Sequence, residues 1–198
     1  DLGSGAGNDA FIARHETGET GRVIGIDFTP AMIEKARHNT EVRGFNNVEF
    51  RQGDIEKMPV TANTADVIVS NCVLNLVPNK DGVFKEIYRV LKTGGHFSIS
   101  DIVLIGELPA DIKNAAEMYA GCVAGAIQKD EYLGLIEAND FTNIILQKEK
   151  VIIIPDDILS NYLSAEQIVL FKKSGTGIFS VTVYAEKTEA CCDSNCCN

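Results

Sequence analysis

Apolar positions along the chain follow two periodicities, and together they predict strands that alternate with helices. Short apolar runs favour strands, whereas apolar residues spaced three and four apart favour helices. Strands are expected at 23–27, 48–50, 65–70, 96–100, 144–149 and 178–186, and helices at 8–15, 30–43, 81–91, 109–126, 129–139 and 155–173. This alternation is typical of an α/β fold with a mostly parallel central sheet and helices on both faces.

The helix at 30–43 has recognisable end signals. Thr29 suits the N-cap, Pro30 the first helical position and Gly44 the residue after the last turn. Glycines also follow the helix at 81–91, where Gly94-Gly95 is expected to end it before the next strand.

The composition of the chain disfavours several classes of protein. The 198 residues are 45% hydrophobic, which suits a globular domain with an ordinary core. The formal net charge of −10 disfavours nucleic-acid binding, since cations supply most of that affinity. No apolar run reaches the roughly 18 residues of a membrane span, so no membrane segment is expected.

A glycine-rich segment, Asp1-Leu2-Gly3-Ser4-Gly5-Ala6-Gly7, precedes the first predicted helix. Glycines allow positive φ and let a ligand approach bare backbone, and a loop at this end of a parallel strand lies where ligands bind. A glycine-rich turn without a ligand is the alternative for this motif alone. Asn8 stands where a dinucleotide fingerprint has its third glycine, which disfavours a pyrophosphate ligand.

Polar residues end the next three strands and strengthen the binding interpretation. Asp27 follows Gly3 by 24 residues, where an acid can accept both ribose hydroxyls. Gly53-Asp54 follows the next strand, where an acid can meet an adenine amino group, and Asn71 ends the strand after it. All three are expected at the same edge of the sheet.

With these residues the chain resembles the class I S-adenosylmethionine-dependent methyltransferases from residue 1 to about 187. Their first motif, acid-x-G-x-G-x-G, is present from Asp1 to Gly7, and a later R-V-L-K-P-G-G motif is matched by 89–95 with Thr93 in place of proline. The resemblance implies that the glycine loop binds the methionine moiety, Asp27 the ribose, and Asp54 with Ile55 the adenine. The implied cofactor-binding set is Asp1, Gly3, Ser4, Gly5, Gly7, Asp27, Phe28, Met32, Gly53, Asp54, Ile55 and Asn71.

The same resemblance bears on chain organisation. Family members carry an apolar strand before the first acid, so the sequence is expected to be N-terminally truncated, with the first strand largely missing. Residues 1–150 are expected to form the S-adenosylmethionine-dependent core and 151–187 a helix and strand that pack on it or extend it. Residues 188–198 are expected to be a flexible, cysteine-rich tail.

Cysteines are unevenly distributed: Cys72 and Cys122 lie in the body, and the tail holds Cys191, Cys192, Cys196 and Cys197. This pattern favours reduced thiols in the cytoplasm over a secreted disulfide framework. Cys72 and Cys122 can be plain core residues. Cys72, however, directly follows Asn71, and Gly121 and Gly125 leave room around Cys122. Two such thiolates can bind a soft, thiophilic centre.

A narrower resemblance is to the arsenite methyltransferases. It rests on the segments 53–59, 70–78 and 106–109, and on Gly121-Cys122 fifty residues after Cys72. It implies that Cys72 and Cys122 bind trivalent arsenic and hold it toward the methyl group. Ala10 stands where many relatives have cysteine, so an exogenous thiol is expected to complete the coordination. The tail cysteines are expected to capture soft metal or metalloid ions, with a merely exposed tail as the alternative.

The leading hypothesis is an arsenite methyltransferase that detoxifies arsenic. It would use S-adenosylmethionine and a thiol reductant (glutathione or thioredoxin), act on arsenite and methylated arsenicals, and be a cytoplasmic monomer. One alternative is a C- or O-methyltransferase of a quinone or small phenol, which needs a general base that no histidine or tyrosine of 70–80 provides. A non-catalytic thiol-based arsenic-binding protein is the other alternative.

Overall fold

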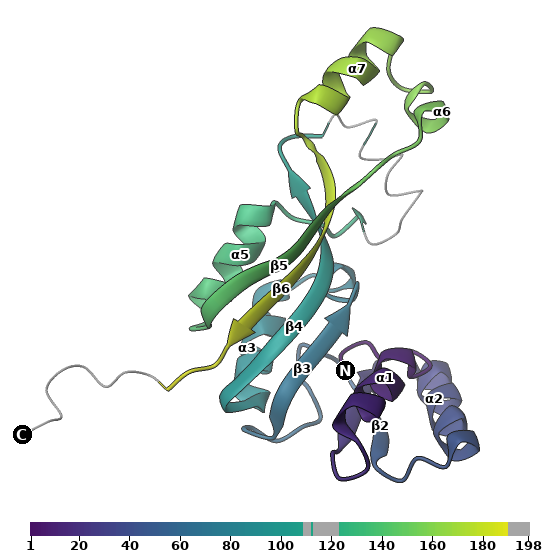
Figure 1. Ribbon diagram of the computed structural model, residues 1–198, viewed down its shortest axis with the longest axis vertical. Coiled ribbons are helices and arrows are strands. Elements are labelled where there is room, and N and C mark those ends of the chain that lie inside the picture. Colours follow the sequence, from purple (N-terminus) through teal and green to yellow (C-terminus); the bar gives the residue numbers. More distant parts are fainter. Residues whose placement is uncertain (109–111, 113–122, 190–198) are drawn as a thin grey trace, which may run out of the picture.

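The computed structural model describes residues 1–108, 112 and 123–189. Helices and strands alternate along the chain (Figure 1). The elements are α1 (Asn8–Thr17), β1 (Val23–Asp27), α2 (Pro30–Arg43), β2 (Val48–Gln52), β3 (Ala65–Asn71), the short 3-10 helix η1 (Leu74–Leu76), α3 (Lys80–Val90), β4 (Leu91–Ile105), α5 (Lys129–Ala138), β5 (Thr142–Ile152), α6 (Asp156–Leu159), α7 (Ala165–Lys173) and β6 (Gly177–Glu186).

The strands pair in the order expected of an α/β fold with a mostly parallel sheet. β1 and β2 are parallel, and β3 and β4 are parallel within the order β3-β4-β6-β5. Leu2 joins the two parts through parallel bridges to Ile26 of β1 and Ser70 of β3. β6 is antiparallel to both β4 and β5 and lies between them.

Two hydrophobic clusters lie on opposite faces of β1, because successive side chains of a strand point to opposite sides. Val23 packs with Ala10 of α1 and Ile33 of α2, whereas Ile26 belongs to the main cluster beneath α3 and α5. The expected helices on both faces are therefore present. Phe84, Phe97 and Tyr132 are among the largest fully buried side chains of the molecule, and all lie in the main cluster.

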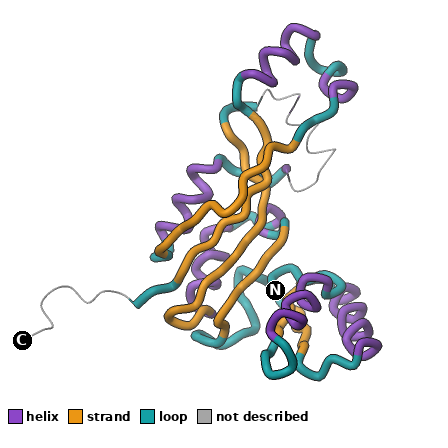
Figure 2. Tube along the Cα trace, viewed as in Figure 1, coloured by secondary structure: helices purple, strands orange, loops and turns teal. Residues whose placement is uncertain are grey.

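A third cluster lies beyond the main one, where the long strands β4, β5 and β6 lead to α6 and α7 (Figure 2). It contains Ile102 and Leu104 of β4 and Ile168 of α7, together with Val123 and Ala126. Cys72 packs against the same cluster. The end of β3 and the chain segment after residue 122 thus share one apolar core.

Several predicted boundaries were wrong. The helix expected at 155–173 is two helices, because Ser160 and Asn161 donate to the Asp157 carbonyl and Ser164 begins a new helix with a capping box to Gln167. β4 begins at Leu91 and runs through Gly94-Gly95, which pair in the sheet instead of forming a loop.

Two further predictions, on the helix at 109–126 and on the N-cap of α2, hold only in part. Most of the helix expected at 109–126 lies outside the described residues, but Ala124 and Gly125 form a turn, so the helix does not extend to Ala126. Thr29 is the N-cap of α2, as predicted, but its side chain makes no capping bond, and its N–H donates to the Asp27 carboxylate.

Lys187 fixes the chain immediately after β6. Its ammonium group donates to Asn63 Oδ1 and to the carbonyls of Tyr88 and Leu91, at 2.8–2.9 Å. Its backbone pairs with Gly94 and Gly95 at the start of β4. Cys72 lies farther along β4, where its N–H donates to the Ser100 carbonyl. The described chain therefore leaves the sheet at the end opposite to Cys72.

Candidate functional site

The glycine-rich loop connects the Leu2 bridge to α1, and each of its three glycines has a positive φ. A Cβ at Gly3 would lie 2.3 Å from Val73 Cγ2, and one at Gly7 2.7 Å from the Phe50 ring. Packing therefore leaves no room for a side chain at either position. Gly5 instead faces open space, with nothing within 4 Å of an added Cβ. Gly5 is therefore the glycine whose bare backbone is available to a ligand.

Asp27 holds this loop in place from the end of β1. Its carboxylate accepts the Gly5 N–H at 2.9 Å and the Thr29 N–H at 2.8 Å, and the residue is only 8% exposed. A carboxylate can accept about four hydrogen bonds, so acceptor capacity remains for a ligand. Because the acceptor is charged, these bonds are stronger than neutral ones.

A cavity of about 260 Å³ opens over the loop, lined by Asp1, Gly3, Ser4, Gly5, Ala6, Asn8, Asp9 and Asn71. Asp1 Oδ2 and Ser4 Oγ are buried without a hydrogen-bond partner within the described part of the chain. Buried polar atoms of this kind call for a donor or acceptor from outside, because leaving them unmet costs free energy. The Asn71 amide donates to Asp9 Oδ2 at 3.4 Å across the cavity.

The remaining predicted cofactor residues lie around Asp27. Phe28 is 72% exposed and Met32 41%, both unusually open for large apolar side chains. Asp54 is exposed and caps its own turn by accepting the Glu56 N–H, whereas Ile55 is buried in the main core. Gly53 donates its N–H to the Asp27 carbonyl. The structure thus brings Gly53 next to Asp27 and leaves Phe28, Met32 and Asp54 accessible.

Cys72 follows β3 directly and is half-buried. Its φ of 57° is in the left-handed region, which costs a non-glycine residue about 1–3 kcal/mol and often marks a functional position. The N–H of Cys72 donates to the Ser100 carbonyl at 2.8 Å. The neighbouring Val73 packs on Gly3, so the thiol-bearing turn contacts the glycine loop.

Cys122 lies outside the described residues, as do the tail cysteines Cys191, Cys192, Cys196 and Cys197. The chain that follows Cys122 is described, however. Val123 is 1% exposed in the cluster against which Cys72 packs, and Gly125 contacts Asn75, three residues after Cys72. The segments after the two predicted arsenic ligands are therefore in contact.

Sequence reasoning missed a buried polar cluster behind Cys72. Asp101 is 1% exposed on β4, and its Oδ2 accepts the Tyr132 hydroxyl at 3.4 Å. Burial raises the pKa of Asp101 to about 7, opposed by its bond to the Ile102 N–H and by the nearby Lys80 ammonium. Burial also lowers the pKa of Lys80 and raises that of Tyr132, with the Asp101 and Cys72 charges adding to the latter. An acid inside the apolar run 99–105 was the available signal.

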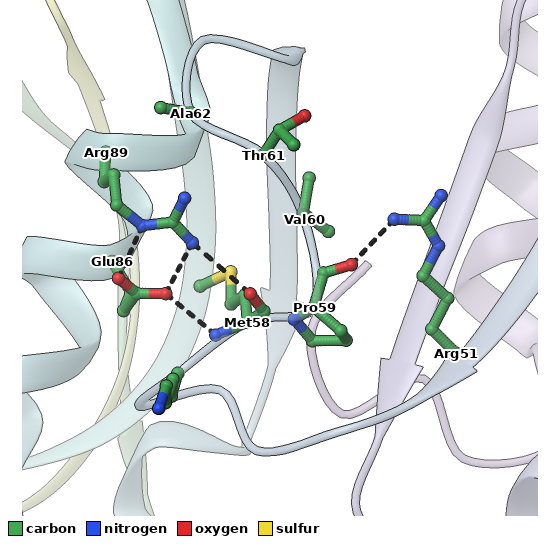
Figure 3. Close-up of a pocket in the computed structure, with 9 residues that line it drawn as sticks. Arg51, Met58, Pro59, Val60, Thr61, Ala62, Glu86 and Arg89 are labelled. Carbon is green, nitrogen blue, oxygen red and sulfur yellow. Dashed lines mark hydrogen bonds and ion pairs between the residues drawn. The ribbon is translucent and has the colours of Figure 1, made fainter.

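A larger cavity of about 720 Å³ lies between β2 and α3 (Figure 3). Three of its charged side chains are already engaged: Arg89 pairs with Glu86 at 2.6 Å, Glu86 accepts the Met58 N–H, and Arg51 donates to the Pro59 carbonyl. These contacts hold the loop between β2 and β3, so we assign this cavity a structural role.

Two other features bear on function. Within residues 1–108, 112 and 123–189, no three histidine, cysteine or acidic side chains are grouped closely enough to hold a metal ion. None of the helices described is long and apolar enough to cross a membrane.

Comparison with known proteins identifies the class. A methyltransferase domain model matches residues 1–140. The chain therefore belongs to the methyltransferase domain family, and its fold is that of the class I S-adenosylmethionine-dependent methyltransferases.

Within this class the chain is similar to arsenite methyltransferases. It is 43% identical over 164 residues to the one from Halobacterium salinarum and 37% identical over 191 residues to the human one, covering 83% and 89% of this chain. These matches cover only 40% and 51% of the relatives, so the chain spans about half of their length or less.

The chain is also similar to a solved structure of an arsenic methyltransferase. The arsenic (III) S-adenosylmethionine methyltransferase from Chlamydomonas reinhardtii superposes with a TM-score of 0.79 at 31% identity, covering 96% of this chain and 63% of that one.

Proposed function

We propose that the protein is an arsenite methyltransferase, which transfers a methyl group from S-adenosylmethionine to trivalent arsenic bound by Cys72 and Cys122. The observation that carries the proposal is the contact between the thiol-bearing turn and the glycine loop: Val73 packs on Gly3, which lines the cavity. The similarity to arsenite methyltransferases of both sequence and structure supports the choice of acceptor.

The residues around the cavity fit S-adenosylmethionine. Asp1 Oδ2 and Ser4 Oγ offer unmet polar atoms to the methionine end, and the bare backbone of Gly5 lets it approach. The remaining acceptor capacity of Asp27 suits the two ribose hydroxyls. Exposed Phe28 and Met32 suit a flat, apolar purine, with Asp54 available to its amino group.

When bound, S-adenosylmethionine supplies an electrophilic methyl group on a sulfonium. The protein's own part is to bind and orient the arsenic. Cys72 and Cys122 hold it as thiolates, the ligand type that soft centres prefer, and its lone pair is the nucleophile. No side-chain base is needed, since no proton leaves the arsenic. Orientation of two reactants is worth roughly 7–11 kcal/mol in favourable cases.

The other functions considered are less well supported. A quinone or phenol methyltransferase needs a base at the acceptor, and within the described residues Asp101 and Tyr132 are buried and paired with each other. A non-catalytic arsenic-binding protein has no use for the unmet polar atoms of the glycine loop.

The proposal also covers the substrates, the reductant, the oligomeric state and the compartment of the protein. Arsenite and methylated arsenicals are the substrates, glutathione or thioredoxin supplies the reducing thiol, and the result is arsenic detoxification. We propose a monomer that works in the cytoplasm, where thiols remain reduced. The tail cysteines capture soft ions ahead of the transfer.

The test compares the full-length protein with a Cys72→Ser/Cys122→Ser variant. Both are incubated with arsenite, glutathione and S-adenosylmethionine, and methylated arsenic is quantified by elemental mass spectrometry. We expect methylarsenic from the wild type and none from the variant. Methylation by the double variant would disprove the ligands, and a folded, cofactor-binding wild type without product would disprove the acceptor.

A further inference from the structure

Gly125 makes the tightest backbone contact of any described glycine. A Cβ at this position would lie 1.9 Å from the Asn75 carbonyl oxygen and 2.9 Å from its carbonyl carbon. Ordinary contact begins at 3.4 Å, so any side chain at residue 125 would force the two segments apart by about 1.5 Å. The contact joins η1, just after Cys72, to the turn just after Cys122.

The requirement for glycine at residue 125 comes from this contact and not from a left-handed backbone, because the φ of Gly125 lies outside the positive region. An alanine here would therefore act through displacement of the neighbouring backbone, not through the φ/ψ preferences of residue 125.

Both sides of the contact are anchored. Asn75 is 5% exposed, and its amide donates to the Ile102 carbonyl at 2.7 Å. On the other side, the Ile127 carbonyl accepts the Leu104 N–H at 2.9 Å, and Gln128 bridges Leu104 and donates to the Gly106 carbonyl. β4 is thus the common support for the two segments, and little movement is available to relieve a clash between them.

We infer that Gly125 and Asn75 are positioning residues whose contact sets the register of the segment from Val123 onward against the turn that carries Cys72, and thereby the capture of arsenite by the two proposed thiol ligands. This inference rests on the proposed function. In the capture, each thiol replaces one hydroxyl of As(OH)₃: an As–S bond forms, an As–O bond breaks, and the thiol proton leaves with the hydroxide as water. Arsenic remains trivalent throughout.

Register matters because the second As–S bond is intramolecular. A second site on one molecule raises affinity by about 10²–10⁴-fold when the geometry permits both bonds and is lost when it does not. Misplacement of reacting groups by about 1 Å is enough to cost on the order of 10²-fold in related situations. We therefore expect Gly125→Ala to weaken arsenite binding by about tenfold or more.

The experiment measures arsenite binding to reduced, full-length protein by equilibrium dialysis with elemental detection. Gly134→Ala is the matched control, because Gly134 is exposed on α5 and an added Cβ meets nothing within 4 Å. We expect Gly125→Ala to raise the arsenite Kd about tenfold or more and Gly134→Ala to leave it unchanged. Both variants should bind S-adenosylmethionine within about twofold of wild type.

A double-mutant cycle separates positioning from general structural damage. In a Cys122→Ser background a single thiol remains, so Gly125→Ala should change the arsenite Kd by less than about twofold. An equal loss with and without Cys122, or an unchanged Kd in a folded Gly125→Ala protein, would overturn the inference.

If Gly125→Ala does not fold, Asn75→Ser removes the brace to Ile102 while keeping the carbonyl. It should raise the Kd in the wild-type background only, and an unchanged Kd would overturn the inference. If Cys72→Ser leaves arsenite binding intact, the proposed function itself fails, whatever the behaviour of residue 125.

Discussion

The proposed cofactor side and the proposed acceptor side of the candidate site are built in different ways. On the cofactor side, the Asp27 carboxylate accepts the N–H of Gly5 in the glycine loop and the N–H of Thr29 just after β1. On the acceptor side, Cys72 has a positive φ and packs against a hydrophobic cluster that includes Val123 and Ala126, about fifty residues later in the sequence. The proposed cofactor side therefore depends on the hydrogen bonds between Asp27 and the glycine loop, whereas the proposed acceptor side depends on apolar packing between segments that are distant in the sequence.

The largest expected effect is on arsenite affinity, and it tests whether the acceptor side can be changed without affecting the cofactor side. Cys72→Ser should lower arsenite affinity by about 10²–10⁴-fold, because only one of two thiols would remain. Binding of S-adenosylmethionine should change by less than about twofold, since the glycine loop and Asp27 are untouched. Parallel titrations with arsenite and with S-adenosylmethionine check this. A comparable loss of cofactor affinity would show that the two sides are one cooperative unit.

The next effect concerns the buried acid behind the acceptor side. The Asp101 pKa is about 7 in the folded protein and near 4 in an unfolded chain. Between these values folding takes up a proton, so this group lowers the free energy of unfolding by about 1.4 kcal/mol per pH unit as pH rises. The total above pH 7 is on the order of 3–4 kcal/mol.

Asp101→Asn should therefore gain stability relative to wild type as pH rises from about 4 to 7, and the difference should level off above pH 7. Urea unfolding at a series of pH values measures it. Asp157→Asn, on the exposed surface of α6, is the control and should follow the wild-type curve. Parallel curves for Asp101→Asn and wild type would show that the carboxyl stays ionised in the folded state.

The smallest effect is on the cofactor side. In Asp27→Asn one carboxylate oxygen becomes an amide NH₂ group, so either Gly5 or Thr29 loses its acceptor. The same change weakens the acceptor proposed for the ribose hydroxyls, and loss of one charge-assisted bond to the ligand, about 1.5–3 kcal/mol, corresponds to roughly 10–100-fold weaker S-adenosylmethionine binding. Calorimetric titration measures this, with Glu34→Gln on the exposed face of α2 as the isosteric control. Arsenite affinity that fell as much as cofactor affinity would contradict the separation of the two sides.

Periodicity and end signals in the sequence predicted most of the fold. The helix from Pro30 to Arg43 and the strand from Val23 to Asp27 match their predicted bounds, because local propensity and burial agree there. The prediction was wrong where side chains ended a helix within an apolar pattern, as at Ser160 and Asn161. It was also wrong at Gly94-Gly95, where pairing with Lys187 extends β4 through two glycines.

The sequence likewise predicted one part of the candidate site and not the other. The glycine loop, Asp27 and the neighbouring thiol could be identified from short motifs, because the chemistry of a contiguous segment is visible in its residues. For Asp101 the sequence shows an acid within an apolar run, but its burial was decided by the packing around β4. The positive φ at Cys72 and the contact of Gly125 with Asn75 appear only in three dimensions. The Gly125 contact joins segments that are distant in the sequence and both held by β4, and packing between such segments leaves no local pattern along the chain.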